Sequence, residues 1–247
     1  MKRLFVIGLG PGDERYLTGE AVEALDNSEV IVGYKVYINL LPERYRAKEL
    51  YSTGMGDEMG RCIAALDMAS QGRDTAVVCS GDAGVYGMAS LILELAEGRI
   101  REEHKEVDIT IIPGITAALS CAARLGAPIG NDFAVVSLST ALTPWEEIEN
   151  RLICAAKGDF VTVIYNPKSR TRTETLDKAC DIMIDCLGGD RISGYVRNMG
   201  RDNEVSAICS LRELKDADID MFTTVFVGNS RTKIIGDKLI TGRKYLN

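Results

Sequence analysis

The chain has 247 residues, 46% of them hydrophobic and 26% charged, with a formal net charge of −7, a composition typical of a globular protein with a substantial core. The negative charge argues against general binding to nucleic acids or anionic membranes, because phosphate binding requires a basic surface. No apolar run has the length of a membrane span or the form of a signal peptide. We therefore expect a cytoplasmic protein.

The first expected strand ends in glycines at alternate positions, Gly8, Gly10 and Gly12. Such a turn allows the backbone to approach a ligand closely. The spacing is one residue short of the dinucleotide fingerprint, Pro11 removes a backbone donor, and Asp13 places a carboxylate where a phosphate would lie. We interpret the turn as a loop for a ligand that is not anionic at this point, with a nucleotide phosphate loop as the alternative.

Strands and helices alternate through the first half of the chain. The expected strands are 4–7, 29–32, 50–51, 75–79 and 107–112, and the expected helices are a short one capped by Thr18, 57–71 and 88–95. This alternation predicts a parallel sheet with ligands beyond the carboxyl ends of its strands. Pro113-Gly114 is the expected boundary between two domains, 1–113 and 114–247.

The second half of the chain has a different pattern of expected strands and helices. Strands are expected at 134–138 and 160–165, and each precedes a helix predicted to open with a capping box, one at Thr143 with Glu146 and one at Thr171 with Glu174. The runs 192–196, 205–209 and 221–227 have short connections, which favour hairpins and a mixed sheet. The predicted fold class is therefore α/β, with a mostly parallel N-terminal sheet and a mixed C-terminal sheet.

The cysteines and the single histidine restrict the possible chemistry. Most of the seven cysteines lie in apolar segments without a C-x-x-C pair, which indicates reduced thiols in the core: Cys62, Cys79, Cys121, Cys154, Cys180, Cys186 and Cys209. His104 lies in a charged run and is expected to be exposed. One imidazole cannot form a zinc site or a Ser-His-Asp triad, so we expect no metal site of the chain's own.

Asp82 follows the strand 75–79 within the small-residue segment Ser80-Gly81-Asp82-Ala83-Gly84. One interpretation is a cap for the next helix, and the other is a contact to a ligand at the rim of the sheet. Small or tightly turning residues also follow the first strand, at 10–12, and the fifth, at 113–118. Three such strand ends at one edge of a sheet predict a binding site.

These segments resemble a known family. Gly8-Leu9-Gly10-Pro11-Gly12-Asp13 with Leu17-Thr18, Ser80-Gly81-Asp82 with Tyr86-Gly87, and Pro113-Gly114-Ile115-Thr116-Ala117-Ala118 resemble, in order, the signatures of the tetrapyrrole methyltransferases, which use S-adenosylmethionine. Tyr165-Asn166-Pro167-Lys168-Ser169-Arg170 and Gly228-Asn229-Ser230-Arg231-Thr232 resemble the branch that methylates precorrin-3B at C-17 in cobalamin biosynthesis. The resemblance implies an active site in a cleft between the two domains, and a homodimer.

The resemblance also implies roles for individual residues. The cofactor site would comprise Pro11, Gly81, Asp82, Val85, Thr116, Ala117, Asn166, Asn198 and Gly200. The substrate site would comprise Gly10, Asp13, Lys168, Ser169 and Arg170. S-adenosylmethionine carries a sulfonium and no phosphate, which suits a turn that contains proline and nearby acids, and S-adenosylhomocysteine would be the product.

The substrate of the family is a macrocycle with many carboxylates, which an acidic protein must meet with local cations. Arg172 lies beside Lys168 and Arg170, and Arg197, Arg201 and Arg231 lie in later loops that are candidates to face the cleft. For each of these side chains the alternative is a solvated surface charge.

No catalytic acid or base is assigned, because methyl transfer to carbon depends mainly on alignment and desolvation. Relatives that methylate uroporphyrinogen carry an aspartate after the second strand, where this chain has Gly33-Tyr34-Lys35. Tyr34, Lys35 and Asp13 are weak candidates for the acid–base help that ring contraction implies.

The sequence predicts methylation of precorrin-3B, or of its cobalt-bearing counterpart, at C-17 with ring contraction. The alternatives are another corrin-ring methyltransferase, an NAD-dependent oxidoreductase and a non-catalytic small-molecule-binding protein. Whether the substrate contains cobalt stays open.

Overall fold

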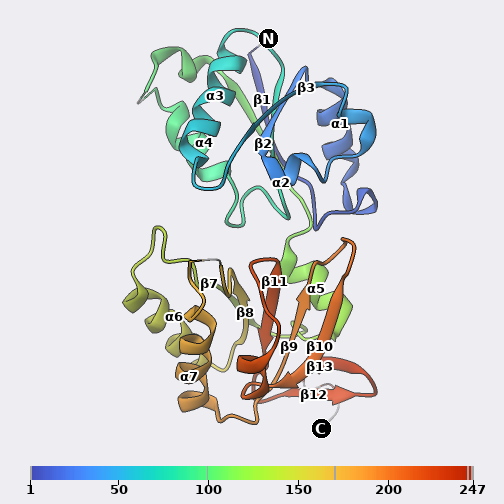
Figure 1. Ribbon diagram of the computed structural model, residues 1–247, viewed down its shortest axis with the longest axis vertical. Coiled ribbons are helices and arrows are strands. Elements are labelled where there is room, and N and C mark those ends of the chain that lie inside the picture. Colours follow the sequence, from blue (N-terminus) through green and yellow to red (C-terminus); the bar gives the residue numbers. More distant parts are fainter. Residues whose placement is uncertain (1, 99, 170, 244, 246–247) are drawn as a thin grey trace. The chain divides into compact units, whose positions relative to one another are not determined.

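The computed structural model describes residues 2–98, 100–169, 171–243 and 245. The chain divides into two compact units, Met1–Thr116 and Ala117–Asn247, hereafter the N-terminal and C-terminal units. Each unit contains a five-stranded sheet with helices (Figure 1). No helix in the described part of the chain is long and apolar enough to cross a membrane.

The N-terminal unit is built around a fully parallel sheet. Its strands are β1 (Arg3–Gly8), β2 (Val30–Tyr34), β3 (Glu49–Thr53), β4 (Thr75–Cys79) and β5 (Asp108–Ile112), in the order β3-β2-β4-β1-β5. Its helices are α1 (Gly19–Asn27), α2 (Lys35–Ile38), α3 (Glu58–Ser70) and α4 (Ala89–Ala96), with 3₁₀ turns η1 (Glu14–Tyr16), η2 (Glu43–Tyr45) and η3 (Glu102–Glu106). Because all five strands are parallel, their carboxyl ends share one edge of the sheet.

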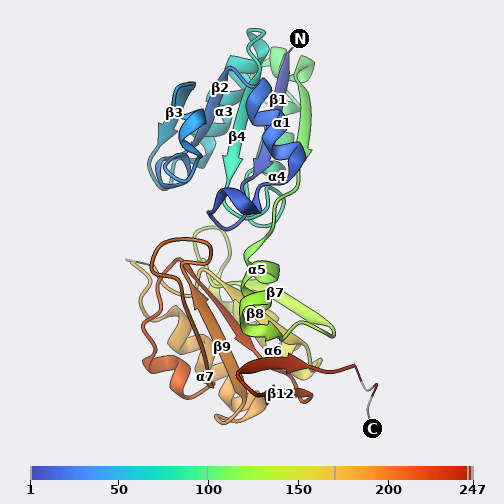
Figure 2. The ribbon, with the colours of Figure 1, turned by 90° about the vertical axis from the view of Figure 1, so that its right-hand side faces the viewer.

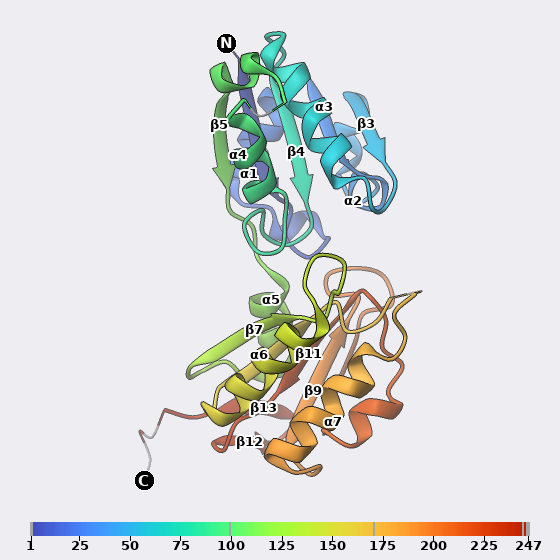
Figure 3. The same cartoon turned by 90° about the vertical axis from the view of Figure 1, so that its left-hand side faces the viewer.

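Both faces of this sheet are covered, as the continuous apolar strands predict. Leu4, Val6 and Val77 pack with α3 and α4 on one face, where these helices lie in front in Figure 3. Ile7 and Ile31 pack with α1 and α2 on the other face, and α1 lies in front in Figure 2.

The C-terminal unit contains a mixed sheet of order β10-β9-β11-β8-β7 and a small sheet of order β12-β13-β6. The larger sheet comprises β7 (Phe133–Ser137), β8 (Val161–Tyr165), β9 (Ile192–Arg197), β10 (Val205–Ser210) and β11 (Thr223–Val227). The smaller sheet comprises β6 (Gly126–Ala127), β12 (Thr232–Ile235) and β13 (Lys238–Thr241). The helices are α5 (Ala117–Leu125), α6 (Trp145–Lys157), α7 (Thr175–Leu187) and the 3₁₀ turn η4 (Glu213–Asp216).

Strand direction decides which loops of the C-terminal unit share an edge. β7 is parallel to β8, and β11 is antiparallel to both β8 and β9. Strands β7, β8 and β9 therefore end at one edge of the sheet, and β11 ends at the opposite edge. Helices α6 and α7 cover one face of the sheet and α5 lies on the other (Figure 1).

The structure confirms the α/β class, the parallel and mixed sheets, and Thr18 as the cap of α1, whose Oγ1 accepts a hydrogen bond from Ala21 N at 3.1 Å. Both predicted capping boxes are wrong. The N-caps of α6 and α7 are Pro144 and Glu174, and neither side chain makes a capping hydrogen bond. Each helix thus starts one or more residues later than its polar signal.

The histidine is buried, contrary to expectation. His104 has no exposed surface, and its Nε2 lies 2.7 Å from Asp67 Oδ1. The 3₁₀ turn η3 directs this one side chain inward while its charged neighbours stay exposed. A charged run gives no sequence signal of such a turn, which explains the error.

Candidate functional site

The carboxyl ends of β1, β4 and β5 meet through glycines. Gly10 and Gly81, both at φ +71°, form an isolated antiparallel bridge in which Gly10 N donates to Gly81 O at 3.0 Å and Gly81 N to Gly10 O at 2.7 Å. A Cβ atom on Gly8 would lie 2.6 Å from Gly114 N, and one on Gly114 would lie 2.1 Å from Gly81 O. The turns are therefore as close as backbone allows, and side chains at these positions would separate them.

Asp82 links two of these turns by hydrogen bonds. Its Oδ1 accepts hydrogen bonds from Gly84 N at 2.8 Å and Val85 N at 3.2 Å, and its Oδ2 accepts one from Gly114 N at 2.9 Å. The N-cap of α4 is Met88, so Asp82 does not cap the helix that follows it. The carboxylate instead fixes the loop after β4 against the loop after β5.

The other predicted cofactor residues of the N-terminal unit lie on these same loops. Pro11 is buried directly after Gly10, and Val85 is half-buried on the loop that Asp82 holds. Thr116, also half-buried, lies two residues after Gly114. The structure thus brings the loops of all five predicted residues of this unit to one edge of its sheet.

Asp13 lies on the same edge and is already paired. Its carboxylate accepts hydrogen bonds from Arg15 N at 2.8 Å and from the Arg15 guanidinium at 3.0 Å. The Arg15 side chain is the main cause that lowers the pKa of Asp13, followed by the backbone hydrogen bond from Arg15. Asp13 is thus an ionised acceptor near neutral pH and a poor proton donor.

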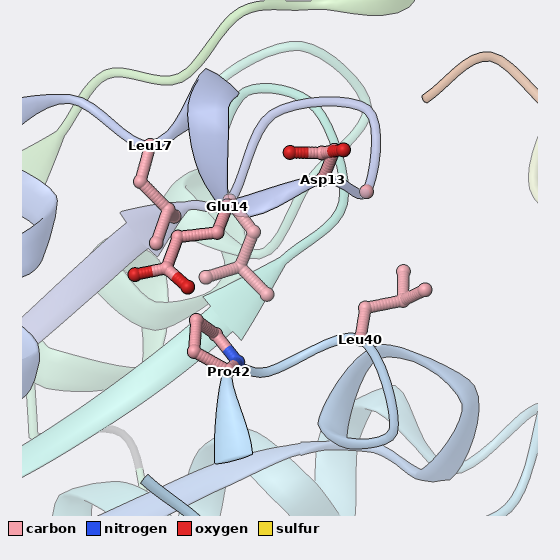
Figure 4. A pocket seen from close by; sticks show the side chains of 7 residues that line it. Asp13, Glu14, Leu17, Leu40 and Pro42 are labelled. Carbon is pink, nitrogen blue, oxygen red and sulfur yellow. The ribbon is translucent and has the colours of Figure 1, made fainter. Parts of the chain in front are cut away.

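A small pocket adjoins Asp13 (Figure 4). Its lining residues are Leu9, Gly12, Asp13, Glu14, Leu17, Leu40 and Pro42, and the Glu14 carboxylate lies between Leu17 and Pro42. The cavity volume of about 10 Å³ is far below the roughly 300–1,000 Å³ typical of small-molecule pockets. This pocket alone does not hold a nucleoside-sized cofactor.

In the C-terminal unit, two predicted asparagines end strands that run in the same direction. Asn166 follows β8 and Asn198 follows β9, and their φ angles of +53° and +55° are left-handed. Asn166 Nδ2 donates to Ser137 Oγ, at the end of β7, at 2.8 Å. Asparagine tolerates the left-handed conformation better than most residues, so both positions form sharp turns at the same edge.

The start of α5 is bonded to this edge. Ala118 N, next to the predicted residue Ala117, donates to the hydroxyl oxygen of Tyr165 at 2.6 Å. Gly200, at φ +68°, lies two residues after Asn198, and its N–H donates to Glu204 Oε2 at 2.8 Å. The four predicted cofactor residues of this unit therefore lie on loops or a helix start at or near one edge of its sheet.

The predicted substrate residues of the C-terminal unit lie after Asn166. Lys168 Nζ is 3.4 Å from Asp177 Oδ1, so its charge is partly compensated. Ser169 Oγ accepts a hydrogen bond from Arg172 N at 3.1 Å, and Arg172 Nη1 donates to Ser139 Oγ at 3.0 Å. Arg170 lies outside the described residues.

Arg231 does not lie at this edge, contrary to expectation. It follows β11, which is antiparallel to β8 and β9, and Ser230 N donates to Asp159 Oδ1, before β8, at 2.8 Å. The segment 228–232 thus lies at the opposite edge of the C-terminal sheet. A second pocket at that edge is lined by Leu187, Gly188, Gly189, Asp190, Arg191, Ile192 and Thr232.

Comparisons with known proteins show which family the chain belongs to. A sequence model of the tetrapyrrole (corrin/porphyrin) methylases matches residues 3–215. The chain belongs to the tetrapyrrole methylase family. As a member, it is a methyltransferase that uses S-adenosylmethionine.

Individual relatives span nearly all of this tetrapyrrole methylase. It is 43% identical to "Probable cobalt-factor III C(17)-methyltransferase" of Methanocaldococcus jannaschii, over 99% of the chain and 98% of that protein. It is 42% identical to "Cobalt-factor III methyltransferase" of Priestia megaterium over 98% of the chain, which spans only 45% of that relative's length. A solved structure of the methyltransferase CobJ is 38% identical with a TM-score of 0.89, and the match covers 97% of this chain and 99% of that one.

In the N-terminal unit of the tetrapyrrole methylase, the sheet edge at which the glycine turns meet suits the methyl donor. Three glycine turns pack backbone against backbone, so the edge presents small residues and main-chain groups where side chains would block access. A loop that binds phosphate needs free backbone N–H groups. Pro11 has no N–H group, and the Asp82 carboxylate already accepts the hydrogen bond from Gly114 N, so this edge differs from a phosphate-binding loop. Among the described residues no group of histidine, cysteine, aspartate or glutamate side chains is arranged to hold a metal ion.

Several side chains at these edges were not found from the sequence. Ser137 and Ser139 hold Asn166 and Arg172 in the C-terminal unit, and Arg61 bonds to the end of β3 in the N-terminal unit. The pair Ser137-x-Ser139 after an apolar strand is a signal that could have identified the first two. Arg61 lies inside a helical pattern, which carries no signal of its contacts.

Proposed function

We propose that this tetrapyrrole methylase transfers a methyl group to C-17 of the cobalt-bearing counterpart of precorrin-3B, with contraction of the ring, in cobalamin biosynthesis. The relatives named as cobalt-factor III methyltransferases match almost the whole chain and support this substrate, and the name of the Methanocaldococcus jannaschii relative supports C-17 as the position. The observation that carries the proposal is the convergence of the three glycine turns at the carboxyl ends of β1, β4 and β5. Cobalt belongs to the substrate in this proposal.

The chain's own residues bind, orient and exclude water. S-adenosylmethionine, when bound, supplies an electrophilic methyl group on a sulfonium and leaves as S-adenosylhomocysteine. Pro11, Gly81, Asp82, Val85 and Thr116 would hold it from the N-terminal unit, and Ala117, Asn166, Asn198 and Gly200 from the C-terminal unit. Gly10, Asp13, Lys168, Ser169 and Arg170 would contact the macrocycle. Holding the two reactants in line supplies most of the acceleration without a protein nucleophile.

The cellular state of the enzyme is a further part of the proposal. All seven cysteines are free thiols, which suits a reducing compartment such as the cytoplasm. A homodimer is proposed from the family resemblance alone. Analytical ultracentrifugation of the full chain measures its mass directly, and a monomer at micromolar concentration would contradict the dimer.

The function is tested by incubating the chain with methyl-labelled S-adenosylmethionine and either precorrin-3B or its cobalt-bearing counterpart. We expect the label in the macrocycle, one added methyl group by mass and C-17 by NMR, with the cobalt-bearing substrate preferred. Label at another carbon would indicate a different corrin-ring methyltransferase, and binding without transfer would indicate a non-catalytic protein.

The cofactor is tested separately by calorimetry with S-adenosylhomocysteine and with NAD. We expect binding of the first alone. Tight binding of NAD alone would overturn the proposed function in favour of an oxidoreductase.

A further inference from the structure

Arg61 is a buried cation without an acidic partner. Only 4% of the residue is exposed, and the guanidinium donates from Nε to Thr53 Oγ1 and from Nη2 to Gly54 O, both at 3.0 Å. Among the described residues, no carboxylate lies within ion-pair distance of it. Asp57, one helical turn earlier, lies instead against Gly60, where a Cβ atom would be 2.4 Å from its Oδ1.

The location of Arg61 is electrostatically unfavourable. It lies near the start of α3, where the helix dipole presents partial positive charge. Burial of an unpaired charge is also costly. An apolar side chain of similar volume would fill this space without either cost, so packing alone does not account for a guanidinium here.

The guanidinium joins the ends of two neighbouring strands. Tyr34 is the last residue of β2 and Thr53 the last of β3, and the two are register partners in the parallel sheet. Arg61 Cζ lies 5.8 Å from the centroid of the Tyr34 ring, within the range of a cation–π interaction. The Tyr34 ring in turn packs edge to face against Tyr37, with centroids 5.2 Å apart.

The same contacts hold an exposed apolar turn. Gly54 O, which accepts from Arg61, precedes Met55, which is 61% exposed, and Gly56 turns at φ +87°. We define Tyr34, Tyr37 and Met55 as the Arg61-held wall. It lies at the carboxyl ends of β2 and β3, the same sheet edge as the glycine turns, because all five strands are parallel.

We propose that Arg61 is a positioning residue that fixes this wall as a packing surface for the flat face of the macrocycle. This inference rests on the proposed function and names a further substrate contact of the N-terminal unit. Aromatic rings and methionine sulfur pack well on a conjugated apolar face. The cofactor loops of this unit follow β1, β4 and β5, so the wall sets affinity for the macrocycle and leaves affinity for the cofactor unchanged.

Arg61→Met tests the inference, with Arg61→Lys to separate charge from geometry. We expect the dissociation constant of the macrocycle, followed by its visible absorbance, to rise about tenfold in both, because lysine lacks the two-point fork of arginine. KM for the macrocycle should rise similarly while kcat and the affinity for S-adenosylhomocysteine stay within about twofold. A purely structural role would instead change both affinities together.

Arg73→Met is the matched control. Arg73 also contacts β3, but at its opposite end, where it pairs with Glu49 at 2.6 Å. We expect wild-type affinity for both ligands in this variant. A loss of macrocycle affinity equal to that of Arg61→Met would overturn the inference.

Two substitutions of Tyr34 decide the matter if Arg61→Met does not fold. Tyr34→Leu removes the ring and should weaken macrocycle binding, whereas Tyr34→Phe keeps the ring and should bind normally. Unchanged macrocycle affinity in folded Arg61→Met, or in Tyr34→Leu, overturns the inference while the wild-type chain still methylates its substrate. If the proposed function is wrong, the result is different: the wild-type chain itself neither binds nor methylates the macrocycle.

Discussion

In the N-terminal unit, the geometry of the sheet edge at which the glycine turns meet depends most on one side chain, that of Asp82. Its carboxylate accepts three backbone hydrogen bonds, two from its own loop and one from Gly114. Substitution to alanine leaves three N–H groups without this acceptor and frees the two loops to move apart. We predict that Asp82→Ala raises the dissociation constant of S-adenosylhomocysteine about tenfold, measured by calorimetry.

Asp82→Asn is the control for this prediction. The amide oxygen can still accept from one of the two loops, so an intermediate affinity is expected. Wild-type affinity in a folded Asp82→Ala protein would show that the carboxylate has no part in cofactor binding.

The sequence predicts the positions of single residues only in part. The convergence of the turns around Gly10, Gly81 and Gly114 was predictable, because glycines after parallel strands must meet at one edge. The burial of His104 and the contacts of Arg61 were not predictable. Both depend on how one side chain of a polar segment is oriented, and neither hydrophobic periodicity nor charge reports that orientation.

The glycine turns act as one element because backbone packs on backbone. A Cβ atom on Gly114 would lie 2.1 Å from Gly81 O and 2.7 Å from Gly8 O, with no flexible side chain to yield. We predict that Gly114→Ala lowers the free energy of unfolding by about 3 kcal/mol, measured by urea denaturation.

Gly19→Ala is the matched control, because a Cβ atom there would meet nothing within 4 Å at the start of α1. Its free energy of unfolding should stay within about 0.5 kcal/mol of the wild type. Equal stability of the two variants would contradict the close packing of the turns.

An ion pair joins the amino ends of β1 and β4. Because it forms only when the carboxylate is ionised, we predict that the free energy of unfolding depends on pH. Arg3 Nε donates to Asp74 Oδ1 at 2.8 Å, and this hydrogen bond is the main cause that lowers the pKa of Asp74 from its ordinary value of 3.8. The unfolded chain therefore binds the proton more tightly, so the stabilisation is present above pH 4 and is lost as the pH falls toward the folded pKa.

Asp74→Asn tests this dependence by urea denaturation at several pH values. We expect the variant to be less stable by about 1 kcal/mol at pH 7, a modest value because the pair is partly exposed. The difference should shrink as the pH falls below about 4, because the carboxyl of the unfolded wild-type chain then binds its proton while the folded chain still resists protonation. A difference that is constant with pH would exclude the ion pair as its cause.

Whole elements were predicted better than their ends or their smallest members. The strand Thr75–Cys79 has the predicted bounds, because five buried apolar or β-branched residues lie between polar turns. The sequence predicts none of the short strands β6, β12 and β13. β6 has two residues and β12 is largely exposed, so their pairing comes from the tertiary fold and leaves no hydrophobic pattern in the sequence.

At the scale of the whole molecule, the cysteines report whether both units are folded. Burial is the main cause that raises the pKa of Cys62 in the N-terminal unit and of Cys180 in the C-terminal unit to about 12. Only Cys154 and Cys186 are exposed among the seven free cysteines. Because the thiolate is the reactive form, burial and a raised pKa both protect the other thiols.

We therefore predict that a disulfide reagent at pH 8 labels Cys154 and Cys186 rapidly in the native chain, and that all seven react in guanidinium chloride. Peptide mapping by mass spectrometry identifies the labelled positions. The double variant Cys154→Ser, Cys186→Ser should lose the rapid phase while it retains the slow one. Rapid native labelling of Cys62 would mean that the N-terminal core is open in solution, and rapid labelling of Cys180 would mean the same for the C-terminal core, so the two thiols test each unit independently.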